Sequence, residues 1–378
     1  MPALSRTDTS VLGRWWWTVD RWTLLAVCAL IGFGYIMMLA ASPAVAERIH
    51  VSRDVFILKQ VVFLALAGAV VVGVSLLSPR GIRRLALLGC LIAIILTFLT
   101  LVTGVEIKGA RRWISLPGMT LQPSEFLKPC FAVVTAWLLS EGQQVQQFPG
   151  VVLSGAVFVV IALLLKSQPD MGMLAVVVAV FFMQLFINGM NLALVGVAAG
   201  GIVAAGIGAY SFFPHVRSRV TRFLDPASGD SYQVNTALEA FANGGLLGRG
   251  AGEGRVKDIL PDAHADFVFA VLGEEFGLVV CVLVLGLFGF IVLRGLLRQL
   301  AEGDLFVVLA SAGLVTSFGL QAFVNMASSL HLIPTKGMTL PFISYGGSSV
   351  LAVALGVGML LALTRRRSRT EPGWESGR

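Results

Sequence analysis

Charged side chains are scarce in this sequence. Only 13% of the 378 residues are Asp, Glu, Lys or Arg, whereas an ordinary soluble domain contains about 25%. The four histidines and four cysteines add few further polar groups. The low charge content argues against an ordinary soluble domain and indicates a chain that lies mostly in lipid.

Residues that hold metals or nucleotides are also few. The cysteines fall inside apolar runs, and the histidines lack the spacing of a zinc site. The glycines of residues 248–252 lie in a polar loop, without the strand and helix that a phosphate-binding loop requires. We therefore expect no cysteine or histidine metal centre, no nucleotide site and no nucleic-acid partner. The residues concerned are Cys28, Cys90, Cys130, Cys281, His50, His215, His264 and His331.

Long apolar runs are abundant. Hydrophobic residues make up 56% of the chain, and a membrane-spanning helix needs about 20 apolar residues in succession. We place about ten such spans, which predicts an all-α, polytopic membrane protein with one long extracytoplasmic loop. The predicted spans begin at Leu24, Leu58, Arg84, Phe126, Val151, Met171, Asn191, Phe267, Leu305 and Leu340.

The distribution of Lys and Arg predicts the orientation. With a cytoplasmic N-terminus, the inner side collects the arginines of residues 6–21, 80–84, 294–298 and 365–369, as the positive-inside rule requires. An even number of spans returns the C-terminus to the same side. We predict a cytoplasmic segment at 1–23, a transmembrane domain at 24–364 with an outer loop at about 214–265, and a cytoplasmic basic tail at 365–378. The basic cluster at 108–112 lies on the outer side against this rule, and we interpret it as kept for function.

Polar residues at membrane depth are costly and often mark function. In residues 122–128, Ser124 can cap a helix, and Glu125 and Lys128 share one helix face because they are three positions apart. An interfacial cap with a snorkelling lysine is an equally good interpretation of these residues alone. At 168–172 a Gln-Pro-Asp corner separates two spans, and a structural turn with Asp170 as helix cap is the better interpretation.

Residues 260–267 lead directly into an apolar run. Asp266 can cap the helix that begins there or act as a base, and the two roles are compatible. Glu274 and Glu275 follow about 12 Å further along, which is too deep for ordinary surface caps. Prolines and paired glycines interrupt the last apolar run at 334–349, and broken helices at membrane depth are tolerated only where they line a cavity or are buried in protein.

These motifs together resemble the SEDS family of peptidoglycan polymerases in order and spacing. The matching residues are 108–113, 122–128, 168–170, 225–226, 232–233, 260–270 and 344–349, so the resemblance covers nearly the whole chain. The turn at 334–337 is similar to the division-site branch of the family rather than to the elongation branch. Ala265, where Thr or Ser is more usual, and Asn243 before a glycine pair depart from the family pattern without removing a titrating group.

The resemblance implies a glycosyltransferase that extends glycan strands from lipid II and releases undecaprenyl pyrophosphate. An α-linked donor and a β-linked product imply direct displacement with inversion, for which one general base suffices. By its match to the family's essential aspartate the base is Asp266, and Lys128 is the candidate neighbour that keeps it ionised and oriented. The candidate substrate-binding residues are Lys108, Arg111, Arg112, Glu125, Arg217, Arg219, His264, Lys336, Ser344 and Tyr345, the basic ones for pyrophosphate.

The resemblance also implies partners and a location. We expect a class B penicillin-binding transpeptidase and division regulators as partners, at the bacterial inner membrane and its division septum. No cofactor and no metal ligand are assigned, and a divalent cation, Mg²⁺ or Mn²⁺, stays an open option. A lipid II flippase, for which broken helices and buried charges are equally apt, and a non-catalytic scaffold are the alternatives from other classes. The elongation-type polymerase is the alternative within the family.

Overall fold

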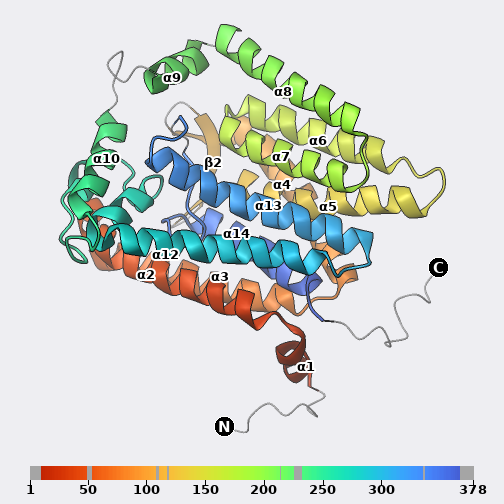
Figure 1. Cartoon of the computed structure of the whole chain (residues 1–378), viewed down its shortest axis with the longest axis horizontal. Helices are drawn as coiled ribbons and strands as arrows, with labels where there is room; N and C mark the ends of the chain where they lie inside the picture. The colour runs from red at the N-terminus through yellow and green to blue at the C-terminus, as the bar shows by residue number, and fades with distance from the viewer. Residues whose placement is uncertain are drawn as a thin grey trace.

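The helices follow the predicted spans closely. The computed structural model describes residues 10–48, 53–107, 110–116, 119–212, 214–224, 232–334 and 337–366, and its long helices run side by side in one bundle (Figure 1). Within that part of the chain, six helices are long and apolar enough to cross a membrane, and two more are shorter and apolar. The prediction of an all-α, polytopic membrane protein is confirmed. The helices are α1 (Val11–Thr18), α2 (Arg21–Arg48), α3 (Arg53–Ser75), α4 (Pro79–Thr103), α5 (Ser124–Gln144), α6 (Gly150–Ser167), α7 (Met171–Ile187), α8 (Leu192–Phe212), α9 (Pro214–Leu224), α10 (Tyr232–Gly244), α11 (Val256–Ile259), α12 (Val268–Gln299), α13 (Leu305–Ser329) and α14 (Gly347–Leu363).

Three features differ from the prediction. The last span begins at Gly347 rather than Leu340, because residues 340–346 form a turn before α14. The segment 214–265, which we expected to be a loop, contains α9, α10 and α11. Three short strands, β1 (Val105–Ile107), β2 (Ala110–Leu116) and β3 (Met119–Leu121), form a small antiparallel sheet, which the all-helical prediction did not include.

Local sequence sets where several helices begin. The Ser78 hydroxyl accepts the backbone N–H of Gly81 at 3.2 Å, and Pro79 occupies the first turn of α4, where a missing N–H costs nothing. Asp304 caps α13 in the same way, by accepting the N–H of Phe306 at 2.9 Å. These caps satisfy backbone donors that would otherwise lack partners at the helix ends.

Helix α13 lies at the centre of the bundle. It packs against α5, α7, α12 and α14, and α14 in turn packs against α3. Of its most apolar 18-residue window, 67% is buried, compared with 22% for α3 and α6. A polar side chain on α13 is therefore enclosed by other helices instead of facing lipid.

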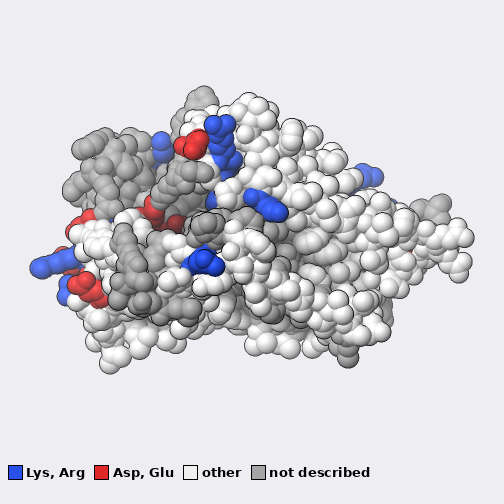
Figure 2. Space-filling model, turned by 90° about the horizontal axis from the view of Figure 1, so that it is seen from above, with Lys and Arg blue, Asp and Glu red and all other residues white. Residues whose placement is uncertain are grey.

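The bundle has two chemically different ends. One end carries the sheet, the corner between α6 and α7, the start of α12 and the turn before α14, and we call it the sheet end (Figure 1). The other end, the terminal end, carries α1, the end of α12 and the last described residues. Figure 2 shows that charged side chains gather toward one end of the face it presents, while most of that face is uncharged.

A carboxylate ties the terminal end together. Asp20, which is 2% exposed, accepts hydrogen bonds from Arg294 at 2.7 and 2.8 Å. It also forms an ion pair with Arg298 at 2.9 Å. Burial by itself raises the pKa of Asp20, but the hydrogen bonds from Arg294 and Thr23 and the charge of Arg298 outweigh it, so the pKa lies below its ordinary value. The link joins the start of α2 to the end of α12.

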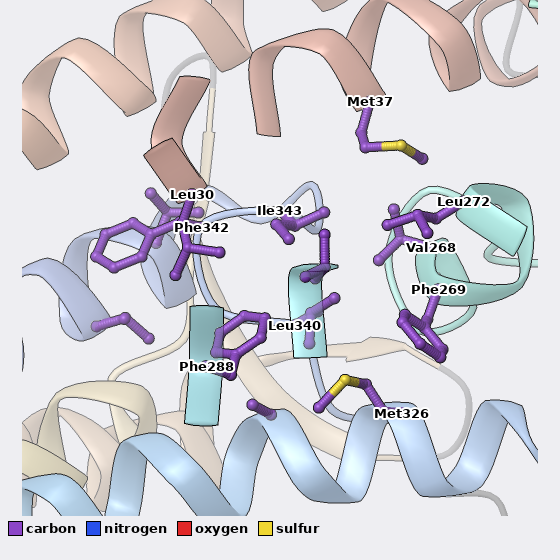
Figure 3. Close-up of a cluster of buried hydrophobic side chains, with 14 of the residues drawn as sticks. Leu30, Met37, Val268, Phe269, Leu272, Phe288, Met326, Leu340, Phe342 and Ile343 are labelled. Carbon is purple, nitrogen blue, oxygen red and sulfur yellow. The ribbon is translucent and has the colours of Figure 1, made fainter. Parts of the chain in front are cut away.

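The turn before α14 is anchored by its own apolar side chains. Leu340, Phe342 and Ile343 are at most 2% exposed and point into the core between α2, α12 and α13 (Figure 3). Burying each such side chain contributes on the order of 1.5–3 kcal/mol. These contacts, together with the local hydrogen bonds from the N–H groups of Ile343 and Ser344 to the carbonyl oxygen of Leu340, hold this segment at the sheet end.

Candidate active site

The turn that carries Asp266 is a defined structure and not a helix cap. The carbonyl oxygen of Asp262, whose φ is 54°, accepts the N–H groups of Ala265 and Asp266 at 3.0 Å each. Helix α12 begins only at Val268, its cap position is Phe267, and no side chain caps it. The interpretation of Asp266 as the cap of that helix is therefore wrong, and the residue is half-buried in the turn that precedes it.

Three donors hold three consecutive carbonyl groups of this turn. The N–H of Tyr345 donates to the oxygen of His264 at 2.9 Å. The hydroxyl of Ser344 donates to the oxygen of Ala265 at 2.6 Å, and the side-chain amide of Asn325 donates to the oxygen of Asp266 at 2.9 Å. Residues distant in sequence thus fix the backbone on which Asp266 stands.

The carboxylate of Asp266 lies against Gly337. A Cβ atom placed on Gly337 would be 3.1 Å from Oδ2 of Asp266, closer than most such contacts. Gly337 is exposed and Asp266 is half-buried. The adjoining residues 335–336, with the predicted phosphate ligand Lys336, lie outside the described residues.

A closed polar network lies in the bundle beside this turn. Lys128 pairs with Glu125 at 2.7 Å and donates to the side chain of Gln321 at 2.5 Å. Gln321 donates to the hydroxyl of Thr339 at 3.1 Å, Thr339 is 2.6 Å from Ser349, and Ser349 donates to Glu125 at 3.3 Å. The network joins α5, α13, the turn before α14 and α14 itself.

Two predictions for the start of α5 are settled by this geometry. Ser124 is the first residue of the helix and does not cap it, since no side-chain hydrogen bond caps α5. Lys128 is 3% exposed and Glu125 8%, so the pair is buried and the alternative of a snorkelling lysine is wrong. The role of Lys128 in orienting Asp266 stays a prediction, because the partners that the structure shows for it are Glu125 and Gln321.

Arg112 connects the sheet to the corner between α6 and α7. Its guanidinium donates to the carbonyl oxygens of Gln168 and Pro169 at 2.8 Å each and lies 3.4 Å from the carboxylate of Asp170. Asp170 caps α7 by accepting the N–H of Met173 at 3.1 Å, which confirms the cap interpretation. Burial raises the pKa of Asp170, and the charge of Arg112 opposes that shift.

Glu274 and Glu275 bind a loop. Both are at most 1% exposed. Glu274 accepts the N–H groups of Arg255 and Val256 at 3.1 and 2.9 Å, and Glu275 accepts from Lys257 at 2.7 Å. The depth that made these carboxylates unusual in the sequence therefore reflects a polar loop that folds back against the start of α12.

A break in α12 makes room for that loop. Gly277 has φ 77° and ψ −179° inside the helix, so the carbonyl groups of Glu274 and Glu275 turn outward and accept the N–H groups of Arg249 and Gly250 at 3.0 Å each. A Cβ on Gly248 would lie 2.2 Å from the carbonyl oxygen of Glu275. The glycines of this loop allow the close approach of two backbones, which is a structural role.

Among the remaining predicted ligands, the structure brings His264 and Tyr345 together. Arg111 on β2 pairs with Glu106 at 3.5 Å on an exposed surface, and Arg217 on α9 stacks over the ring of Tyr210, 5.4 Å from its centre. The ring of His264 lies 5.5 Å from that of Tyr345, and burial raises the pKa of the Tyr345 hydroxyl.

Three further predicted site residues are Lys108, Arg219 and Ser344. Lys108 lies outside the described residues, and for Arg219 only the backbone in α9 is described. The Ser344 hydroxyl, 0% exposed, is used by the turn, since it also accepts the N–H of Leu340 at 2.8 Å. Among the described residues, no group of three or more His, Cys, Asp or Glu side chains could hold a metal ion.

Gln321 and Asn325 were missed by the sequence-based prediction. They stand four positions apart in an apolar span, and therefore on one helix face. Both are at most 2% exposed. A pair of amides on one face of a membrane helix is the signal that could have found them, because buried polar groups in a span need partners.

Known proteins with a similar sequence or structure come from cell-wall synthesis. A family model described as a cell cycle protein, named for FtsW, RodA and SpoVE, matches residues 21–369. A probable peptidoglycan glycosyltransferase FtsW of Caulobacter vibrioides is 43% identical over 97% of this chain and 94% of its own length. The corresponding protein of Escherichia coli is 34% identical over 91% of this chain and 85% of its own length.

Solved structures agree with this fold. A chain of a peptidoglycan synthase complex that coordinates polymerization and crosslinking is 28% identical, with a TM-score of 0.75 over 92% of this chain and 97% of that one. The rod shape determining protein RodA of Thermus thermophilus is 27% identical, with a TM-score of 0.67 over the same shares. Sequence and structure thus point to the same group of membrane proteins.

Proposed function

The chain belongs to the FtsW, RodA and SpoVE family of cell cycle proteins, as an FtsW-like SEDS glycosyltransferase of septal peptidoglycan synthesis, and we propose that it polymerises lipid II with Asp266 as general base. The observation that carries the proposal is the position of this carboxylate. It stands on a turn held by three long-range hydrogen bonds, outside any helix cap and beside an exposed glycine.

The chemistry requires one proton transfer and one displacement. Asp266 accepts the proton of the acceptor sugar's 4-hydroxyl while that oxygen bonds to the anomeric carbon of the donor. The bond from that carbon to pyrophosphate breaks, and undecaprenyl pyrophosphate leaves with the electron pair. Since the leaving group is already a stabilised anion, a single base is sufficient.

Cationic groups stabilise the charge that develops on the leaving group. Arg111 is half-exposed on β2 at the sheet end, with a side-chain exposure of 52%, and Lys108, Arg217, Arg219 and Lys336 are the further candidates. Arg112 contributes by fixing β2 to the corner before α7. We propose that these cationic groups act on the pyrophosphate leaving group.

The sheet end faces the outside of the cell in this proposal. The terminal end carries arginines on several elements, including Arg80, Arg83, Arg294, Arg298 and Arg365, which is typical of a cytoplasmic face. Both termini are then cytoplasmic and Asp266 faces the outer leaflet, where a lipid-linked disaccharide is polymerised. We also propose a class B transpeptidase partner, division regulators and a septal location, supported by the matched chain from a synthase complex.

Polymerisation of lipid II by purified protein with its transpeptidase tests the function. Asp266→Asn should lower glycan synthesis by about 10²- to 10⁴-fold, the contribution of a general base, with an unchanged elution profile in detergent. Glu239→Gln, which removes an exposed carboxylate on α10 at the same end, is the matched control and should polymerise like the wild type. Normal polymerisation by Asp266→Asn would refute the base.

A flippase is the second candidate, because ion pairs and broken helices inside a bundle also suit transport. The buried Glu125–Lys128 pair and the break at Gly277 are the observations that favour it. A wild-type protein that makes no polymer but moves labelled lipid II across vesicle membranes would decide for transport.

A further inference from the structure

We propose that Asn325 is a positioning residue for glycosyl transfer, because its side-chain amide fastens the turn carrying Asp266 to the segment carrying Gly337. The inference rests on the proposed function and adds a residue to it. Asn325 lies near the end of α13, the most enclosed of the candidate spans, and is 0% exposed. It therefore touches no substrate and acts through its neighbours.

The amide of Asn325 bridges two separate pieces of backbone. Its Nδ2 donates to the carbonyl oxygen of Asp266 at 2.9 Å and to that of Met338 at 2.6 Å. Asp266 stands two residues before the start of α12 and Met338 directly after Gly337, so one side chain ties together the two segments that meet at the carboxylate. The two segments are more than 70 positions apart in the chain, and no local sequence fixes their separation.

The orientation of this amide follows from its partners. Both neighbours are carbonyl oxygens, which only accept, so the NH₂ group faces them and uses both of its hydrogens. Among the described residues, Oδ1 of Asn325 has no partner in the protein. The two bonds to Asp266 and Met338 are therefore the ones through which this side chain acts.

The separation of the two segments sets the place of the base. Oδ2 of Asp266 lies 3.1 Å from the position of a Cβ on Gly337, so a small shift between the segments moves the carboxylate relative to the exposed surface. A displacement of about 1 Å in a reacting group can lower a rate on the order of 10²-fold. Substrate binding, which uses other groups, is not changed by such a shift.

The test replaces the amide by a carboxyl group of the same shape. Asn325→Asp puts an acceptor opposite two carbonyl oxygens and removes both donors. Gln184→Glu on α7 is the matched control, since Gln184 is also 0% exposed and donates through one nitrogen to two carbonyl oxygens, of Ala132 at 2.6 Å and Leu309 at 3.1 Å. Gln184 lies near the last residue of α7, at the opposite end of that helix from the sheet end and Asp266.

Turnover per folded molecule separates positioning from stability. Folded protein is quantified by monodisperse elution, and kcat and KM for lipid II are measured for the wild type, Asn325→Asp and Gln184→Glu. We expect kcat of Asn325→Asp to fall by about 10- to 100-fold with KM unchanged, while Gln184→Glu loses thermal stability and keeps its kcat. The kcat of Asn325→Ser, which retains one donor, should lie between that of Asn325→Asp and that of the wild type. This variant replaces Asn325→Asp in the test if Asn325→Asp does not fold.

Two results overturn the inference without touching the proposed function. One is a kcat for the Asn325 variants within about twofold of the wild type, when Asp266→Asn in parallel preparations is inactive. The other is an equal loss of kcat in Gln184→Glu, which would make both amides merely structural. If Asp266→Asn polymerises normally, the proposed base fails first and the positioning role fails with it.

Discussion

Replacing Lys128 with methionine removes one half of the buried ion pair beside the site. The ammonium group lies 2.7 Å from the carboxylate of Glu125, and the two side chains are 3% and 11% exposed. In Lys128→Met the carboxylate keeps only the hydroxyl of Ser349, at 3.3 Å, among the partners seen in the described residues. A buried charge without its counter-charge is strongly unfavourable.

The stability that Lys128→Met is expected to lose can be compared with that of a variant in which both partners are replaced by neutral side chains. Removing one partner of a buried ion pair typically costs about 3–5 kcal/mol, whereas replacing both partners by neutral groups of similar volume is often neutral or stabilising. Lys128→Met should therefore lower the folded-to-unfolded ratio by roughly 10²- to 10⁴-fold. The double variant Glu125→Gln/Lys128→Met should recover most of that stability.

Stability and activity measured on the same preparations then separate two roles of Lys128. The thermal midpoint is determined from the fraction of protein that still elutes as a single species after heating. Glycan synthesis is measured with lipid II as the substrate. If Lys128 orients Asp266, the double variant is stable but remains poorly active. Wild-type polymerisation by the double variant would refute the orienting role, and an unchanged midpoint for Lys128→Met would refute the burial argument.

Three further predictions follow from close approaches and charge. Gly337→Ala places a methyl group 3.1 Å from Oδ2 of Asp266 and should lower kcat by about 10-fold or more without lowering the thermal midpoint; an unchanged kcat would contradict the placement of the carboxylate. Gly248→Ala, with φ 83° and a Cβ 2.2 Å from a carbonyl oxygen, should lower the midpoint more than Gly245→Ala, with φ 54° and open space. The pKa of Asp20 is lowered in the folded protein, so the contribution of its charge to the free energy of unfolding is complete above about pH 4 and is lost as the pH falls through the lowered value. The difference in thermal midpoint between the wild type and Asp20→Asn should therefore become smaller as the pH is lowered.

Much of the membrane architecture could be predicted from the sequence, because a span must satisfy its backbone within itself and therefore shows as a long apolar run. The predicted starts at Leu24, Met171 and Leu305 fall within or at the beginning of α2, α7 and α13. The start at Leu340 was wrong because the apolar residues of that turn enter the core without forming a helix. Periodicity and hydrophobicity cannot distinguish these two ways of burying the same side chains.

The candidate site was only partly predictable for a related reason. Asp266, Glu125 and Lys128 stood out because charged groups near apolar runs are rare and expensive. Their partners could not be deduced, since Gln321 and Asn325 reach them across 193 and 59 positions of the chain. Spacing along one helix predicts neighbours on that helix and says nothing about which helix lies opposite.

The sequence by itself determined that the chain is a polytopic membrane protein and which charged residues are exceptional, because the transfer of apolar and charged groups between water and lipid is a local property of each segment. Only the tertiary structure decided what the polar residues do: Asp266 does not cap α12, Glu274 and Glu275 hold a loop, and Asn325 joins two distant segments. A hydrogen bond between distant segments exists only after packing has brought them together.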